Sequence, residues 1–353
     1  MKMRTLLLTV LLGTVLVLSE AAAAGTAESG TDTNPETSES QNLVIYAYDS
    51  FVSDWGPGPQ VIPLFEEATG ITVDLVSAGD AGQVLSRAII EKDDPQADII
   101  LGIDNNLLHQ AKAAGILEAY TPEGIEVIRP ELLFDADSYI TPFDYGYFSV
   151  IYDSEKIIIP PATLEDLTKA EYKDSLILMD PRTSSPGLGF LFWTIKVYGD
   201  DYLAYWERLS PSILTITDGW DSGYGLFTNG EAPMVISYTT SPPYHVEYEE
   251  TTRYQAAIFN EGNYLQIEGV GIVKGGPNRA AAETFMDFML TIPFQDALPL
   301  TNFMYPINKE VVLPGSFDYA PQPETILSLD PDYISANREK LIQDWVELMG
   351  TLK

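Results

Sequence analysis

The chain has 353 residues, of which 45% are hydrophobic, and a formal net charge of −33 at pH 7. A surface this acidic repels nucleic acid and anionic membranes, because binding phosphate groups requires positive charge. The sequence contains no cysteine, which excludes disulfides, thiolate metal sites, thiol catalysis and the acylated cysteine of a lipoprotein. The negative charge would concentrate a cationic ligand, but a solvated coat that serves solubility alone explains it equally well.

The first 41 residues carry the features of an exported protein. Lys2 and Arg4 precede an apolar stretch at residues 6–18, and a run of alanines follows. This order is typical of a cleaved signal peptide, here residues 1–24, and the apolar stretch is short for a membrane-spanning helix. Residues 25–41 are rich in Ser, Thr, Glu and Gly, so they cannot bury a core and are expected to form a disordered tether.

Short β-rich runs alternate with helical patterns from residue 43 onward. Strands are predicted at residues 43–48, 71–78 and 97–103, and helices at residues 60–69, 81–91 and 105–114. This βαβα order predicts a mostly parallel sheet with helices on both faces. Residues 139–154 then form an extended run that is too long for one ordinary strand, so we expect it to cross from one lobe to another.

A second α/β set follows this crossing. Its predicted strands and helices lie at residues 175–181, 186–198, 201–209, 221–229 and 233–239, and residues 264–275 form a second extended run, expected to be the return crossing. The tail predicts helices at residues 278–290 and 335–349, with Trp345 packing inward.

The length beyond the tether, about 310 residues, favours two lobes rather than one core. We assign residues 42–149 and 263–353 to lobe I and residues 150–262 to lobe II. In open α/β sheets, ligands bind at the carboxyl ends of the strands. That rule nominates five segments in which polar and aromatic residues gather: residues 48–55, 77–80, 104–106, 182–185 and 238–244.

Aromatic residues in these segments are candidates for holding a flat ligand. In YDSFVSDWGPGP, Tyr48 and Trp55 enter a loop fixed by Gly and Pro, where contact with a ligand and capping of the sheet edge both remain open. Further along lie Trp220, Tyr238 and Tyr244, whose ring faces could hold a heteroaromatic cation, with about 0.5 to 2 kcal/mol gained per ring.

Two polar candidates accompany the aromatic ones. In PRTSSPGLGFLFW, Ser184 or Ser185 can cap a helix whose free amides form an anion site, although an ordinary capped helix is the commoner outcome. Asp80 follows a strand and precedes a helix, so it is either an N-cap or an acceptor for an amine of the ligand. His109 and His245 are too few and too far apart to predict a metal site or a catalytic pair.

The motifs resemble those of the thiamine-binding proteins of bacterial ABC importers, a branch of the type II periplasmic binding proteins. The matching strings keep the family's order over most of the chain from Leu43 to Asn308: YDSFVSDWGPGP, ADIILGIDNNLL, PFDYGYFSVIYD, DPRTSSPGLGFLFW, KVYGDD, GWDSGYGLF, SYTTSPPYH and NFMYPIN. The resemblance implies an α/β fold of two lobes, each a mostly parallel sheet flanked by helices, with the ligand in the cleft between them.

The resemblance also implies a function. The expected role is that of a periplasmic, monomeric solute-binding protein without enzymatic activity, cofactor or metal, which delivers thiamine or its phosphates to an ABC permease and its ATPase. Trp220, Tyr238 and Tyr244 would surround the thiamine rings, Asp80 would meet the aminopyrimidine, and Ser184 would take the hydroxyethyl or phosphate end. Seven positions match residues that line the family's cleft: Tyr48, Trp55, Asp80, Ser184, Trp220, Tyr238 and Tyr244.

Three alternatives compete with this interpretation. A thiaminase-like enzyme has a similar fold and ligand, but its members attack thiamine with a cysteine that this chain lacks. A ferric-binding protein of a related family commonly uses adjacent tyrosines, and no Tyr-Tyr pair occurs here. A polyamine-binding protein combines aromatic residues with several carboxylates, so this alternative remains open.

Overall fold

The computed structural model describes residues 42–352. The predicted signal peptide, residues 1–24, and the predicted tether, residues 25–41, lie outside this part of the chain. All elements described below belong to one unit, Ser40–Lys353. Within the described part, no helix is both long and apolar enough to cross a bilayer.

The strands of the described residues join in one mixed sheet. They are β1 (Asn42–Ala47), β2 (Thr72–Ser77), β3 (Ile99–Leu101), β4 (Leu117–Glu118), β5 (Thr141–Asp153), β6 (Leu176–Met179), β7 (Ile213–Thr217), β8 (Met234–Tyr238), β9 (Tyr254–Ala256), β10 (Asn263–Val273), β11 (Tyr305–Pro306) and β12 (Ile326–Leu327). Along the main path their order is β2-β1-β3-β10-β5-β8-β6-β7.

Two sets of parallel strands form the ends of this path. In the first set β1 pairs with β2 and β3, and in the second set β6 pairs with β7 and β8, all in parallel. The parallel order predicted from the βαβα pattern is therefore confirmed within each set. The strands between the sets, β5 and β10, run antiparallel to their neighbours and make the whole sheet mixed.

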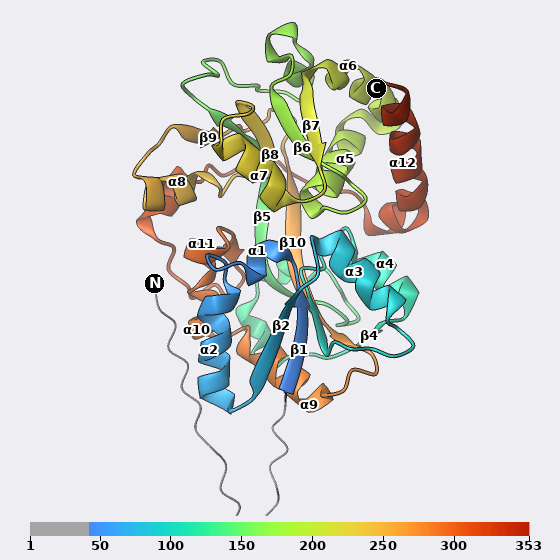
Figure 1. The fold of residues 1–353 in the computed structure, drawn as a ribbon, viewed down its shortest axis with the longest axis vertical. Helices are drawn as coiled ribbons and strands as arrows, with labels where there is room; N and C mark the ends of the chain where they lie inside the picture. Colours follow the sequence, from blue (N-terminus) through green and yellow to red (C-terminus); the bar gives the residue numbers. More distant parts are fainter. Residues whose placement is uncertain (1–41, 353) are drawn as a thin grey trace, which may run out of the picture. The chain divides into compact units, whose positions relative to one another are not determined.

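Strand β5 is the long extended run predicted at residues 139–154. Residues 141–147 pair with β10, and residues 148–152 pair with β8. All thirteen residues of β5 are buried, and Figure 1 shows β5 and β10 running between the two groups of helices. The strand thus passes from one parallel set to the other, as expected, whereas the residue boundaries assigned to the two lobes stay predictions.

Helices cover both faces of the strand sets. They are α1 (Asp49–Val52), α2 (Gly58–Thr69), α3 (Ala81–Ile90), α4 (Leu108–Ala114), α5 (Ser185–Tyr198), α6 (Tyr202–Leu209), α7 (Trp220–Thr228), α8 (Pro242–Glu249), α9 (Arg279–Phe288), α10 (Ile292–Gln295), α11 (Leu298–Thr301) and α12 (Pro331–Thr351). In Figure 1, α2 and α3 lie on opposite sides of β1 and β2. Each predicted helix is present, with ends shifted by a few residues.

The structure adds elements that the sequence analysis did not predict, above all helix α8 and strand β7. Helix α8 begins with Pro242 and Pro243, which lack the amide hydrogens that a first helical turn leaves unpaired in any case. The sequence analysis gave this region only as a segment at a strand end, without a helix. Strand β7 lies at the edge of the sheet and none of its five residues is buried. Its sequence, ILTIT, lacks the continuous apolar run of its neighbours.

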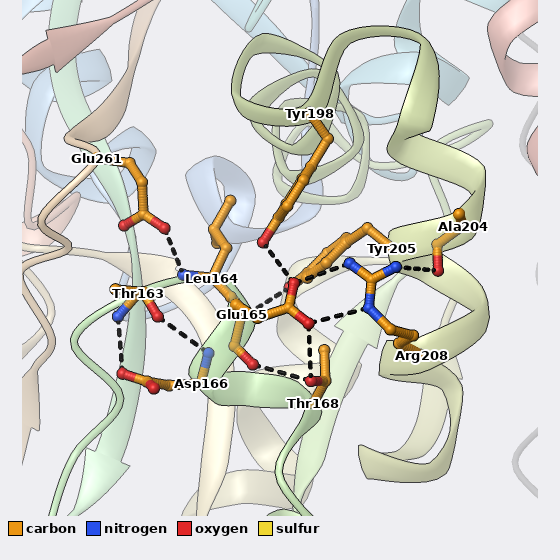
Figure 2. A network of polar contacts seen from close by, with 10 residues as sticks. All are labelled: Thr163, Leu164, Glu165, Asp166, Thr168, Tyr198, Ala204, Tyr205, Arg208 and Glu261. Carbon is orange, nitrogen blue, oxygen red and sulfur yellow. Dashed lines mark hydrogen bonds and ion pairs between the residues drawn. The ribbon is translucent and has the colours of Figure 1, made fainter.

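A polar network fixes a short 3-10 helix, Glu165–Thr168, against α5 and α6 (Figure 2). The Glu165 carboxylate accepts hydrogen bonds from the Arg208 guanidinium at 2.8 and 2.9 Å and from the Tyr198 hydroxyl at 3.1 Å. The hydroxyl of Tyr205, buried beneath this network, donates to the Leu164 carbonyl at 2.9 Å. These bonds hold the segment after β5 onto the helices of the second strand set.

The C-terminal helix α12 packs against both groups of helices. It contacts α4 near the first strand set and α6 near the second. Trp345 is 3% exposed and meets Trp206 edge to face, with ring centroids 5.4 Å apart. The inward packing predicted for Trp345 is therefore confirmed.

Replacing Trp345 with alanine removes this buried aromatic contact. We expect Trp345→Ala to lower the free energy of unfolding by about 3–5 kcal/mol, as is usual for a large aromatic residue in a core. Chemical denaturation measures the change. Tyr333→Ala is the matched control, because Tyr333 lies on the same helix and is 39% exposed. Equal and small effects of the two substitutions would contradict the packing of α12 described here.

Candidate ligand-binding site

A cavity of about 350 Å³ opens where strands of both sets end. Tyr48 and Asp80 lie just after β1 and β2, and Trp220 and Tyr238 lie after β7 and at the end of β8. The cavity therefore lies at the carboxyl ends of the strands, where the rule for open α/β sheets places a ligand. Its volume falls within the range typical of small-molecule sites.

Six of the seven predicted site residues line this cavity. They are Tyr48, Trp55, Asp80, Trp220, Tyr238 and Tyr244. Ser184 does not line it, but its neighbour Ser185 does. The structure therefore brings together residues that lie almost 200 positions apart, while their contact with a ligand stays a prediction.

Two tryptophans lie next to each other in the wall of the cavity, with their ring planes at 51°. Trp55 follows α1 and is 50% exposed, and its ring lies 6.2 Å from the ring of Trp220 at the start of α7. The Trp220 indole is fixed from behind, because it stacks on Tyr224 at 4.8 Å and its Nε1 donates to the Ser237 hydroxyl at 2.9 Å. A held ring and an exposed ring together suit a flat ligand. Tyr224 thus both packs in the core and lines the cavity.

Hydrogen bonds and ring contacts fix the three tyrosines. The Tyr238 hydroxyl donates to Gln266 Oε1 at 2.6 Å, and the Tyr48 hydroxyl accepts from the Asn302 side-chain amide at 2.9 Å. The Tyr244 ring meets Phe303 edge to face at 5.3 Å. Because these contacts fix the rings in advance, little conformational freedom remains to be lost on binding.

Asp80 has backbone partners on both sides of the cavity. Its Oδ1 accepts from the Ala81 amide at 2.7 Å, and it forms a capping box with Gln83 at the start of α3. Its Oδ2 accepts from the Trp220 amide at 3.1 Å, at the start of α7. The N-cap alternative is thus observed, and one carboxylate joins two helix starts that belong to different strand sets. The hydrogen bond that we expect between Asp80 and an amine of the ligand stays a prediction.

The start of helix α5 is faced by carboxylates. Ser184 is the N-cap residue, and the hydroxyls of Ser184 and Ser185 are buried. Burial raises the pKa of Asp80, and the side chain of Ser184 lowers it in part. Burial also raises the pKa of Asp104, to about 6, and the side chain of Ser185 lowers it in part. The helix end predicted to bind an anion therefore already has acidic groups nearby, which its dipole stabilises.

The sequence analysis missed four polar residues at the cavity: Asp144, Asp221, Glu268 and Asn302. Asp221, Glu268 and Asn302 line it, and Asp144 accepts a hydrogen bond from the Asn302 amide at 2.5 Å. A usable signal was present, because Asp144 lies in PFDYGYF and Glu268 in LQIEGVG, each an acid within a buried strand. Burying a carboxylate is costly, so such a position points to a special role.

The ionisable side chains with a charge that line the cavity are all acidic: Asp80, Asp221 and Glu268. Burial, with Asp49 and Asp80 nearby, raises the pKa of Asp221 to about 6. None of the described residues that line the cavity is basic. Within residues 42–352, no group of acidic or histidine side chains is arranged to hold a metal ion. Aromatic faces beside uncompensated carboxylates are complementary to an organic cation.

Comparisons with known proteins agree on one family. Residues 51–295 match the model of the family described as bacterial extracellular solute-binding protein. The thiamine-binding periplasmic protein of Brucella melitensis is 43% identical over 314 residues, which cover 88% of this chain and 93% of that protein. The protein of the same name from Escherichia coli is 40% identical, over 86% of this chain and 92% of that protein.

A solved structure agrees with these sequence relatives. A periplasmic thiamin binding protein matches with a TM-score of 0.82 and 38% identity, over 92% of this chain and 99% of that chain. The predicted two-lobed α/β fold of the type II periplasmic binding proteins is therefore confirmed. The family match covers more than half of the chain, and the curated relatives exceed 30% identity over most of it. This chain belongs to the bacterial extracellular solute-binding proteins.

Proposed function

We propose that this protein captures thiamine in the cavity between the two strand sets and delivers it to an ABC importer. The observation that carries the proposal is the likeness, at 40–43% identity over most of the chain, to proteins named for thiamine binding. The site supports it independently, since a flat organic cation matches a cavity lined by fixed aromatic rings and carboxylates.

The ligand's rings would lie against the two tryptophans. Trp220 is fixed by Tyr224 and Ser237, and Trp55 is exposed enough to adjust to a ligand. Tyr244 also lines the cavity, and the hydroxyl groups of Tyr48 and Tyr238 are held by hydrogen bonds to Asn302 and Gln266. The start of α5, which Ser184 caps and where Ser185 lines the cavity, would accept the hydroxyethyl or phosphate end.

The role is binding and transport rather than catalysis. The chain has no cysteine for a thiaminase-like attack, and the cavity needs no cofactor or metal to hold a cation. We further propose that a cleaved signal peptide directs export to the periplasm. There the protein would act as a monomer and hand its ligand to a permease and its ATPase. The curated relatives carry periplasmic names, which supports the location.

Calorimetry with a panel of ligands tests the proposal. We expect thiamine and its mono- and diphosphate to bind, and spermidine and Fe(III) to give no comparable heat. Spermidine is the sharpest competitor, because a polyamine also suits aromatic faces and carboxylates. Tight binding of spermidine with no heat from thiamine would overturn the proposal in favour of the polyamine alternative.

Trp220→Ala tests the aromatic wall. We expect it to weaken thiamine binding by about 1–2 kcal/mol, which is roughly five- to thirty-fold in Kd, because a stacked cation loses one ring face. Tyr319→Ala is the control, since Tyr319 is 49% exposed and lies outside the residues that line the cavity. A folded Trp220→Ala variant with unchanged thiamine affinity would contradict this role.

A further inference from the structure

Two buried carboxyl groups lie side by side next to the cavity, and one of them, Glu268, lines it. Asp144 in β5 and Glu268 in β10 are direct cross-strand partners in the antiparallel ladder, and such partners have Cβ atoms about 5 Å apart. Asp144 is 0% exposed and Glu268 is 7% exposed. The ladder register shifts immediately after Glu268, an irregularity of the kind that directs side chains at functional sites.

Each carboxyl group keeps one oxygen without a partner among the described residues. Asp144 Oδ2 accepts from the Asn302 amide and Glu268 Oε1 accepts from the Gln266 amide at 2.9 Å. Asp144 Oδ1 and Glu268 Oε2 are buried and unpaired. Glu268 also lines the cavity, so a carboxyl group with an unsatisfied oxygen lies beside the space that a ligand would occupy. Buried polar groups of this kind need a partner.

Another aspartate on the same strand provides a contrast within the molecule. Asp153, also in β5, is 2% exposed and is held by the Arg253 guanidinium at 2.5 and 2.7 Å. This pairing keeps the pKa of Asp153 below its usual value. The chain thus supplies a base to one buried aspartate of the strand and none to the other.

The surroundings of the pair are acidic or neutral. The groups that shift the pKa of Glu268 most, besides its burial, are Asp144, Tyr48, Asp104 and Asp80, from β5 and the segments after β1, β3 and β2. Tyr238 of β8 also interacts with Glu268, and Arg338 of α12 interacts with Asp104 instead. Two adjacent buried carboxyl groups without a base cannot both be ionised.

We propose that Asp144 and Glu268 form an anionic subsite that an organic cation completes, and that the bound cation replaces a proton held by the two carboxyl groups. This inference deepens the proposed function and rests on it. On binding, the positive charge of the ligand enters the cavity, one carboxyl group ionises, and its proton passes to the solvent. Capture is therefore coupled to the release of up to one proton.

The direction of the pKa shifts of Asp144 and Glu268 agrees with this proton exchange. Burial raises the pKa of Asp144 to about 8 and raises the pKa of Glu268 well above its usual value, with Asp144 adding to the shift of Glu268. A nearby cation lowers both pKa values, so the liganded protein holds fewer protons than the free one. Affinity should then rise with pH between 6 and 8, by at most tenfold per pH unit.

Calorimetry of thiamine binding in two buffers of different ionisation enthalpy counts the released protons. For the wild-type protein at pH 7 we expect release of up to one proton and an affinity that rises from pH 6 to pH 8. Asp144→Asn and Glu268→Gln should each reduce both effects. Asp153→Asn is the matched control, because this aspartate lies on the same strand, is equally buried and is already ionised over this range.

The ligand-free proteins provide a second readout that does not depend on binding. Carboxyl groups with raised pKa hold more protons in the folded state than in the unfolded state, so they make stability fall as pH rises from about 5 to 8. We expect the wild-type Tm to fall over this range and to fall less in Asp144→Asn and Glu268→Gln.

The outcomes separate the two proposals. Thiamine binding without proton release, at an affinity independent of pH, would overturn the proton exchange and leave the proposed function intact. Identical pH profiles of Tm for the wild type and both variants would also overturn it. The absence of binding heat at every pH would overturn the proposed function and this inference together.

Discussion

The proposed binding of a cation depends on one electrostatic constraint. Two buried carboxyl groups lie on neighbouring strands, and no basic side chain nearby neutralises their charge. Asp144 and Glu268 face each other across β5 and β10. In a folded protein this arrangement is costly, because burial disfavours the charged form and like charges repel. A bound cation would offset this cost, because it provides the positive charge that no described group near the pair provides.

The position of this pair connects the fold to its function. Strand β5 passes from one parallel set to the other, so the pair lies on the part of the sheet that joins them. Nearby, Asp80 bonds the starts of α3 and α7 with one carboxylate, one helix from each side of the cavity. A cation bound beside Glu268 would therefore lie close to the point where both sides of the cavity meet.

Much of this architecture follows from local sequence. Alternating apolar runs and helical patterns predicted β1 to β3 and α2 to α4, and the rule for strand ends placed five aromatic or acidic residues at the cavity. The Asp144–Glu268 pair was missed because it depends on the register between strands 124 positions apart in sequence, which no local pattern encodes. Ser184 was placed at the helix start correctly, but its neighbour faces the cavity, since a shift of one residue turns a side chain by about 100° on a helix.

Comparing thiamine with an uncharged analogue of the same shape tests the need for positive charge most directly. Both ligands would be titrated into the wild-type protein at pH 8, where the carboxyl pair is most ionised, and their dissociation constants compared. The account predicts that the uncharged analogue binds at least tenfold more weakly and that Glu268→Gln narrows this difference. Equal affinity of the two ligands for the wild-type protein would contradict it.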